Sequence, residues 1–127
     1  MSRDLGNYDA KVELLQALER HSELVNLVTG GFHNRVANQE AEFPRVVYTE
    51  LNNRPTSYAD NDERQATVNF QISVFTKEAT VQYETQIVKL IDEIMKNLEY
   101  GKYDSIELYE EDTHIYHKGL RYEKHFK

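Results

Sequence analysis

The sequence predicts an α+β domain: a mostly antiparallel four-stranded sheet with two main helices on one face, in the order α-β-β-α-β-β. Two patterns carry this prediction. Residues 67–75 alternate apolar and polar side chains, which is typical of a strand with one dry face and one wet face. Residues 80–100 place apolar side chains three or four positions apart, which is typical of an amphipathic helix. This order of elements favours a sheet covered by helices on one side.

The first predicted element is a helix over residues 8–21, followed by a short helical segment over 22–29. The apolar stripe of the helix consists of Tyr8, Val12, Leu15 and Leu18, with Leu14 beside them. Asn7 is the expected N-cap, because its side chain can accept a hydrogen bond from a free amide of the first turn. The pair Gly30-Gly31 predicts a sharp change of chain direction. Residues 32–43 show neither period, so we expect an irregular connection there.

Two strands are predicted in the middle of the chain, over residues 45–51 and 67–75, joined by a polar loop over 52–63. Hairpin connections usually take about 2–5 residues, so a loop of roughly a dozen residues usually binds a partner or is disordered. We expect this loop to be mobile in the isolated protein and to become ordered against a neighbouring subunit. The candidate interface residues are Arg54, Tyr58, Asp60 and Asp62.

A long helix over residues 80–100 follows the second strand. Its apolar stripe consists of Ile87, Ile91, Ile94 and Leu98. Gly101 is the expected stop signal of this helix. Two further strands, over residues 105–110 and 118–126, complete the predicted sheet. We therefore expect one domain over residues 1–127, with its core spanning about 8–126.

Composition narrows the possible function. The chain carries 22 acidic and 15 basic residues, a formal net charge of −7, which disfavours electrostatic binding to nucleic acid or to an anionic membrane. The absence of cysteine excludes disulfides, thiolate nucleophiles and cysteine-ligated zinc. We see no apolar segment long enough for a signal peptide or a membrane span, so we expect a cytoplasmic protein.

Catalytic signatures are absent from the sequence. The only candidate metal ligands are His114 and His117, which follow a run of carboxylates. A separation of three residues would place the two imidazoles on opposite faces of a strand. No serine lies in a Gly-x-Ser-x-Gly turn, and Gly30-Gly31 lacks the Lys-Ser/Thr of a phosphate-binding loop. We therefore expect no enzyme activity, no bound metal and no cofactor.

Three segments resemble the tail-completion and tail-terminator proteins of long-tailed bacteriophages and related prophages, which join heads to tails. The segments are residues 24–33, residues 42–48, and residues 70–76 at the entry to a helix. The positions that carry the resemblance include Gly30, Pro44 and Tyr48, and the resemblance extends from Tyr8 to Phe126.

The resemblance implies a non-catalytic structural protein. Such proteins form a ring, commonly hexameric, that caps the tail tube and joins it to the head, and DNA then passes through the ring. The implied partners are further copies of the chain, tail-tube proteins and head-connector proteins, with no membrane and no sequence-specific nucleic-acid binding. The implied locations are the host cytoplasm during assembly and the neck or tail of the virion afterwards.

Two alternatives remain open at the level of the sequence. The chain could be a small acidic adaptor that binds one cellular protein as a monomer or dimer. It could also be a metal-dependent hydrolase built around His114 and His117.

Overall fold

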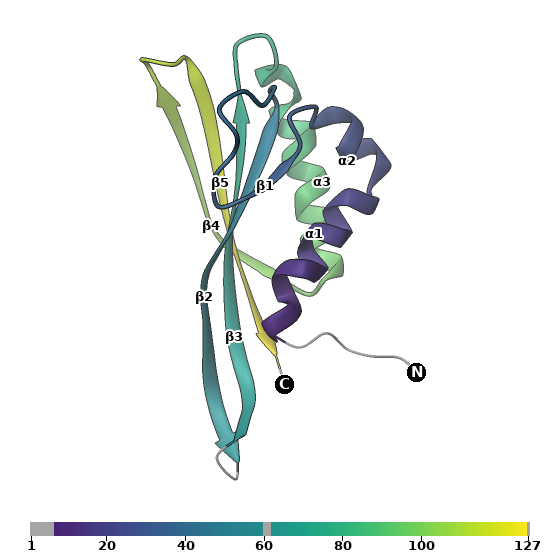
Figure 1. Ribbon diagram of the computed structural model, residues 1–127, viewed down its shortest axis with the longest axis vertical. Helices are drawn as coiled ribbons and strands as arrows, with labels where there is room; N and C mark the ends of the chain where they lie inside the picture. Colours follow the sequence, from purple (N-terminus) through teal and green to yellow (C-terminus); the bar gives the residue numbers. More distant parts are fainter. Residues whose placement is uncertain (1–6, 60–61, 127) are drawn as a thin grey trace.

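The computed structural model describes residues 7–59 and 62–126, with side chains over 7–55 and 65–126 (Figure 1). A five-stranded sheet forms one layer, and the helices pack on one face of it. In chain order the elements are η1 (Asn7–Asp9), α1 (Ala10–Arg20), α2 (Ser22–Leu27), β1 (Phe32–Asn34), β2 (Arg45–Ala59), β3 (Asp62–Thr76), η2 (Val81–Tyr83), α3 (Glu84–Asn97), β4 (Gly101–Glu110) and β5 (Ile115–Phe126).

The sheet is mixed rather than antiparallel, with strand order β1-β2-β3-β5-β4. The pairs β2/β3, β3/β5 and β4/β5 are antiparallel, whereas β1 runs parallel to β2. The α+β class is therefore confirmed, and the prediction of four strands is wrong. The fifth strand, β1, lies in the segment that was expected to be irregular. Three residues are too few to show an alternating pattern, so the sequence contains no period that would reveal this strand.

The Gly30-Gly31 turn places β1 beside β2. Gly31 has a φ of +82°, a conformation that glycine adopts without strain. The Gly30 amide donates to the Pro44 carbonyl oxygen at 2.8 Å, and a Cβ atom on Gly30 would lie 1.8 Å from the carbonyl oxygen of Glu42. Only a residue without a side chain allows the two backbone segments to approach this closely.

The core lies between the helices and the sheet. Alternate residues of β3 point into it, as the sequence predicts, and meet the predicted stripe of α3. The fully buried core side chains include Val68, Phe70, Ile72 and Val74 of β3, Ile87 and Ile91 of α3, Leu14 and Leu18 of α1, and Leu120 and Tyr122 of β5.

The α1 stripe differs from its prediction. Tyr8 and Val12 are 79% and 53% exposed, whereas Ala10, Leu14 and Leu18 are buried at a spacing of four residues. Because the α-helix begins at Ala10, the face that meets the sheet is set by Ala10 rather than by Tyr8. Asn7 is not the N-cap.

The side-chain amide of Asn7 donates from Nδ2 to Asn53 Oδ1 at 2.8 Å. The side-chain amide of Asn53 donates from Nδ2 to the backbone carbonyl oxygen of Asn7 at 2.8 Å. These two bonds attach the N-terminal turn to β2. At the other end of α1, His21 caps α2, since its Nδ1 accepts from the Leu24 amide at 3.2 Å.

Both C-terminal strands are longer than predicted, and α3 ends three residues earlier than predicted, at Asn97. Gly101 is not the stop of α3. The left-handed residue after the helix is Glu99, with a φ of 70°, and Gly101 is the first residue of β4. Over residues 7–59 and 62–126, no helix combines the length and apolarity needed to span a membrane.

Candidate functional site

The β2–β3 hairpin extends beyond the helices as an arm (Figure 1). We define the arm as residues 54–59 and 62–67. Backbone pairing runs along it from Arg54 opposite Thr67 to Ala59 opposite Asp62. The polar loop predicted over residues 52–63 is therefore wrong, because its described residues, 52–59 and 62–63, continue the two strands.

Two features concealed the arm in the sequence. Beyond the body of the domain a strand has no dry face, so its side chains do not need to alternate between apolar and polar. The pairing also contains register shifts around Leu51, Thr56 and between Ser57 and Tyr58. Pro55 lies past the end of β1, where the outer side of β2 has no partner strand in the described residues, and an edge position tolerates proline.

The predicted interface residues are distributed along this arm. Arg54 is exposed near its base. Tyr58 and Asp62 lie in the strands near the tip, where their backbones pair with Glu63 and Ala59, and their side chains are outside the described part of the structure. Asp60 lies outside the described residues altogether. A role for these residues in an interface stays a prediction.

The sheet face opposite the helices, which we call the open face, carries a network of polar side chains. Thr67 Oγ1 and His125 Nδ1 lie 2.8 Å apart, and the Asn69 amide donates to Tyr103 and Glu123. Further hydrogen bonds link Ser73 to Gln71 and His117, and Arg121 to Gln71. Cross-strand pairs of this kind stabilise a sheet face that no helix covers.

The candidate metal ligands His114 and His117 have separate protein partners. His114 lies in the β4–β5 turn with a φ of 57°, and its Nδ1 is 2.9 Å from the Tyr109 hydroxyl. His117 lies in β5, where its Nε2 is 2.8 Å from Ser73 Oγ and its ring stacks on Phe75 at a centroid distance of 4.4 Å. Among the described side chains, no three or more His, Asp or Glu residues gather in a group that could hold a metal ion.

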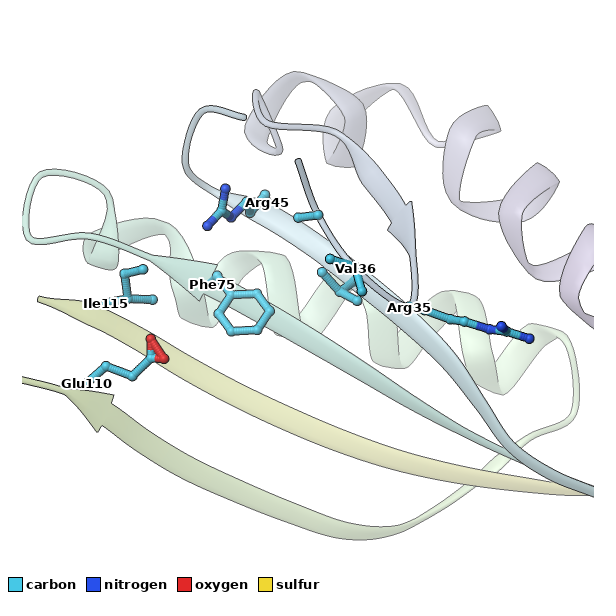
Figure 2. A pocket seen from close by; sticks show the side chains of 8 residues that line it. Arg35, Val36, Arg45, Phe75, Glu110 and Ile115 are labelled. Atoms are coloured by element: carbon cyan, nitrogen blue, oxygen red, sulfur yellow. The ribbon is translucent and has the colours of Figure 1, made fainter. Parts of the chain in front are cut away.

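A pocket of about 270 Å³ lies at the end of the open face far from the arm (Figure 2). The Phe75 ring and the Val36 side chain point toward it, while the Arg35 side chain points away. Its lining residues are Arg35, Val36, Ala37, Arg45, Val47, Phe75, Glu110 and Ile115. The lining contains one carboxylate and no hydroxyl, thiol or imidazole, so the pocket suits an apolar side chain rather than acid–base chemistry.

Arg45 has a structural role beside this pocket. Its Nη1 donates to the carbonyl oxygens of Asn38 and Ala41, at 2.9 and 3.3 Å. Its guanidinium also lies 4.2 Å from the centroid of the Phe43 ring, on which the Lys77 ammonium lies at 5.1 Å. Arg45 therefore fixes the connection between β1 and β2. The pocket cannot be predicted from the sequence, because its lining comes from four separate segments.

Strand edges are the other prominent surfaces. β4 is the last strand on its side of the sheet, and all of its residues except Ile106 are exposed. Tyr103, Leu108 and Tyr109 are large exposed side chains on this strand. The molecule is thus an α+β domain that presents an arm and two strand edges, which are surfaces typical of assembly.

Comparison with known families agrees with this description. The family described as "Tail completion protein gp17" matches residues 12–123, and the chain belongs to this family. The resemblance inferred from the sequence is thereby confirmed. Comparison with curated proteins found no match.

Two solved structures share the fold. A chain in the virion of a native gene transfer agent particle superposes with a TM-score of 0.66 at 13% identity, over 89% of this chain and 90% of that chain. The gp17 protein of bacteriophage SPP1 superposes with a TM-score of 0.50 at 13% identity, over 92% of this chain and 88% of that chain. At this identity the likeness concerns the fold.

Proposed function

We propose that this chain is a non-catalytic structural protein of phage or prophage virion assembly, which forms a ring that terminates the tail tube and joins it to the head. The observation that carries the proposal is the family match over residues 12–123. The partners are further copies of the chain, in a hexameric ring on assembly, together with tail-tube and head-connector proteins. Assembly takes place in the host cytoplasm, and the protein remains in the neck or tail of the virion.

The shape of the molecule supports an assembly role. The arm extends past the helices, which places it at one end of the molecule, where a neighbouring protein can meet it (Figure 1). Arg54 is exposed on it and can form charge-assisted hydrogen bonds with a partner carboxylate. In a symmetric ring every subunit junction repeats the same contact, so one favourable contact acts many times.

The side-chain geometry supports a non-catalytic reading. Two described pairs, Thr67 with His125 and Ser73 with His117, place a serine or threonine hydroxyl beside an imidazole as in a nucleophile and its base. Thr67 is only 3% exposed. Ser73 is only 5% exposed, and its hydroxyl also accepts a hydrogen bond from Gln71. A substrate carbonyl could not reach either hydroxyl oxygen without displacement of the surrounding side chains. Both pairs therefore fit a role in sheet stability.

The test is complementation of a phage or prophage that lacks its own copy of this gene. Arg54→Glu should reduce the number of joined heads and tails at least about tenfold, because the reversed charge recurs at every junction. His114→Ala with His117→Ala should leave joining unchanged. Lys89→Glu, an equal charge reversal at an exposed position of α3, is the matched control and should also join normally.

Electron microscopy of the particles separates the alternatives. Failure of the histidine double variant while it remains folded, together with normal assembly by Arg54→Glu, would support the metal-dependent hydrolase. Normal particles from every variant and from the gene deletion would instead favour the adaptor.

A further inference from the structure

We infer that the β4 edge of one copy pairs antiparallel with the β1 edge of a second copy. The sheets of neighbouring subunits then join side by side through two different edges, which is a heterologous (head-to-tail) contact. This inference rests on the ring proposed above and names the surfaces that would close it. Both strands belong to the same sheet, of which β1 is the outermost strand at one edge and β4 the outermost strand at the other.

Both edges have free backbone groups. Within the described residues, β4 pairs only with β5, and β1 pairs only with β2. Each edge therefore presents backbone groups that no strand pairs, which is the template that a further strand needs. On β1 the Asn34 carbonyl oxygen already accepts from the Val36 amide at 2.8 Å, so the amides of this edge and the Phe32 carbonyl are the groups left for a partner.

Strand directions make the two edges compatible. β1 is parallel to β2, and three successive antiparallel pairings lead from β2 through β3 and β5 to β4. β1 and β4 consequently run in opposite directions. A second copy placed beside the first in the same orientation would bring its β1 antiparallel to β4, which continues the alternation already present in the sheet.

The pairing register fixes which residues meet. Across the sheet, Phe32 is level with Val46, Val74, Lys118 and Glu107, and Asn34 is level with Tyr48, Ile72, Leu120 and Ser105. A closed ring has no net rise from one subunit to the next. With the strands running along the ring axis, Asn34 of the second copy would therefore lie opposite Ser105, and Phe32 opposite Glu107.

The chemistry at this register is complementary. Arg35 follows Asn34 at the point where the chain leaves β1 in a turn, with a φ of 69°. Its long side chain would come close to Asp104, which precedes Ser105. The Arg35 side chain is exposed and has no ion-pair partner within the described part of the chain. Asp104 Oδ1 accepts from the Ser105 amide at 2.9 Å, and the described cation nearest to its carboxylate is Arg121, at 4.0 Å. Phe32 and Tyr109 would be diagonal neighbours on the helix-covered face, a spacing that aromatic side chains can bridge.

The same residues disfavour a two-fold dimer through β4. β4 carries the carboxylates Asp104, Glu107 and Glu110 but a single cation, Lys102. Pairing β4 with its own copy would bring carboxylates together across the junction, and like charges on adjacent strands are destabilising. A head-to-tail contact avoids this repulsion, and it is also the type of contact that closes into rings.

Disulfide crosslinking tests the register directly, because the chain has no cysteine. Cα atoms of cross-strand partners lie about 4.5–5.5 Å apart, within the reach of a disulfide. Within one copy, β1 and β4 are separated by four strand spacings, roughly 19 Å, so any disulfide between them must join two copies. The variants are Asn34→Cys with Ser105→Cys, and Arg35→Cys with Asp104→Cys; Arg54→Cys with Ser105→Cys is the control for an unmatched height.

We expect mild oxidation of either matched pair to link most of the full-length chain into a ladder of oligomers that ends at a closed ring. The control pair should form no ladder.

Charge exchange provides a second measurement. Arg35→Glu and Asp104→Arg should each raise the dissociation constant of the oligomer at least about fivefold, and the combined variant should restore it.

Four outcomes would overturn the inference. They are the absence of disulfides at every concentration, a ladder from the control pair, a dimer from Ser105→Cys alone, and no restoration by the charge exchange. Rings that form without matched disulfides would overturn only this interface and leave the proposed ring intact. The complementation assay tests the proposed function separately, because it measures whether heads and tails are joined.

Discussion

Ser73 and His117 show at the scale of single residues how surroundings decide what a side-chain pair does. Burial lowers the pKa of His117, and the Glu110 carboxylate opposes this effect only in part. The lowered pKa favours the neutral imidazole, and the ring stacks on Phe75. A stacked ring bonded to a buried hydroxyl links β3 and β5 on the open face, which is a structural task.

A buried residue of α3 and an exposed residue of α1 together test which helix faces meet the sheet. Ile91→Ala should lower the free energy of unfolding by about 2–5 kcal/mol, because Ile91 is fully buried between α3 and the sheet. Val12→Ala should change it by less than about 0.5 kcal/mol, since Val12 is exposed. Urea titrations of both variants provide the measurement. A loss at Val12 as large as that at Ile91 would mean that the sequence-derived stripe, and not the structure, describes α1.

At the scale of elements, the strength of a local pattern decided what the sequence could predict. α3 and β3 were recognised because their periods extend over many residues and one face of each is buried, as at Ile87 and Ile72. β1 is positioned by the Gly30-Gly31 turn and by pairing with β2. These contacts join separate segments and produce no periodic pattern in the amino-acid sequence. Among the described side chains of the arm, only Ala66 and Thr67 at its base are buried, so the arm has no sustained alternation that would predict it.

The candidate surfaces follow the same rule. The sequence identified Arg54 and Tyr58 by their chemistry, and the structure places both on one projecting element although the predicted loop was wrong. The free β4 edge could not be predicted, because only the strand order shows which strand is last. The sequence likewise could not show that Arg35 and Asp104 lie at the same height.

The arm itself can be removed without loss of the core. Replacement of residues 56–65 by Asn-Gly, a good two-residue hairpin turn that keeps Pro55 opposite Ala66, should change the free energy of unfolding by less than about 1 kcal/mol. The buried side chains of β3 from Ala66 onward remain in place. The same variant should fail to join heads to tails if the arm contacts a partner.

Denaturant titration and complementation of the same preparation separate the two effects. A variant that folds normally and still joins heads to tails would show that the arm is dispensable for assembly. A strongly destabilised variant would show that the arm belongs to the cooperative fold.

At the scale of the whole molecule, the arm and the β4–β5 turn lie at opposite ends of the sheet (Figure 1). A head-to-tail junction through β1 and β4 would use the sides of the sheet and leave both ends free. On the proposed arrangement, one end can meet the tail tube and the other the head. The carboxylates of the β4–β5 turn, Glu110, Glu111 and Asp112, would then make one end of the ring acidic.

The net charge of the chain predicts how a ring would interact with DNA. Each copy contributes −7, so a ring accumulates negative charge and repels duplex DNA wherever the charges are not neutralised. Proteins that hold DNA through phosphate contacts release counterions and lose affinity steeply with salt. We therefore expect the purified protein, as monomer or ring, to leave the mobility of duplex DNA unchanged even at about 20 mM salt, where electrostatic binding is strongest. A basic DNA-binding protein of similar size is the positive control. Retardation of the DNA that disappears with added salt would show a cationic surface that contacts phosphates, and would contradict a lumen through which DNA slides freely.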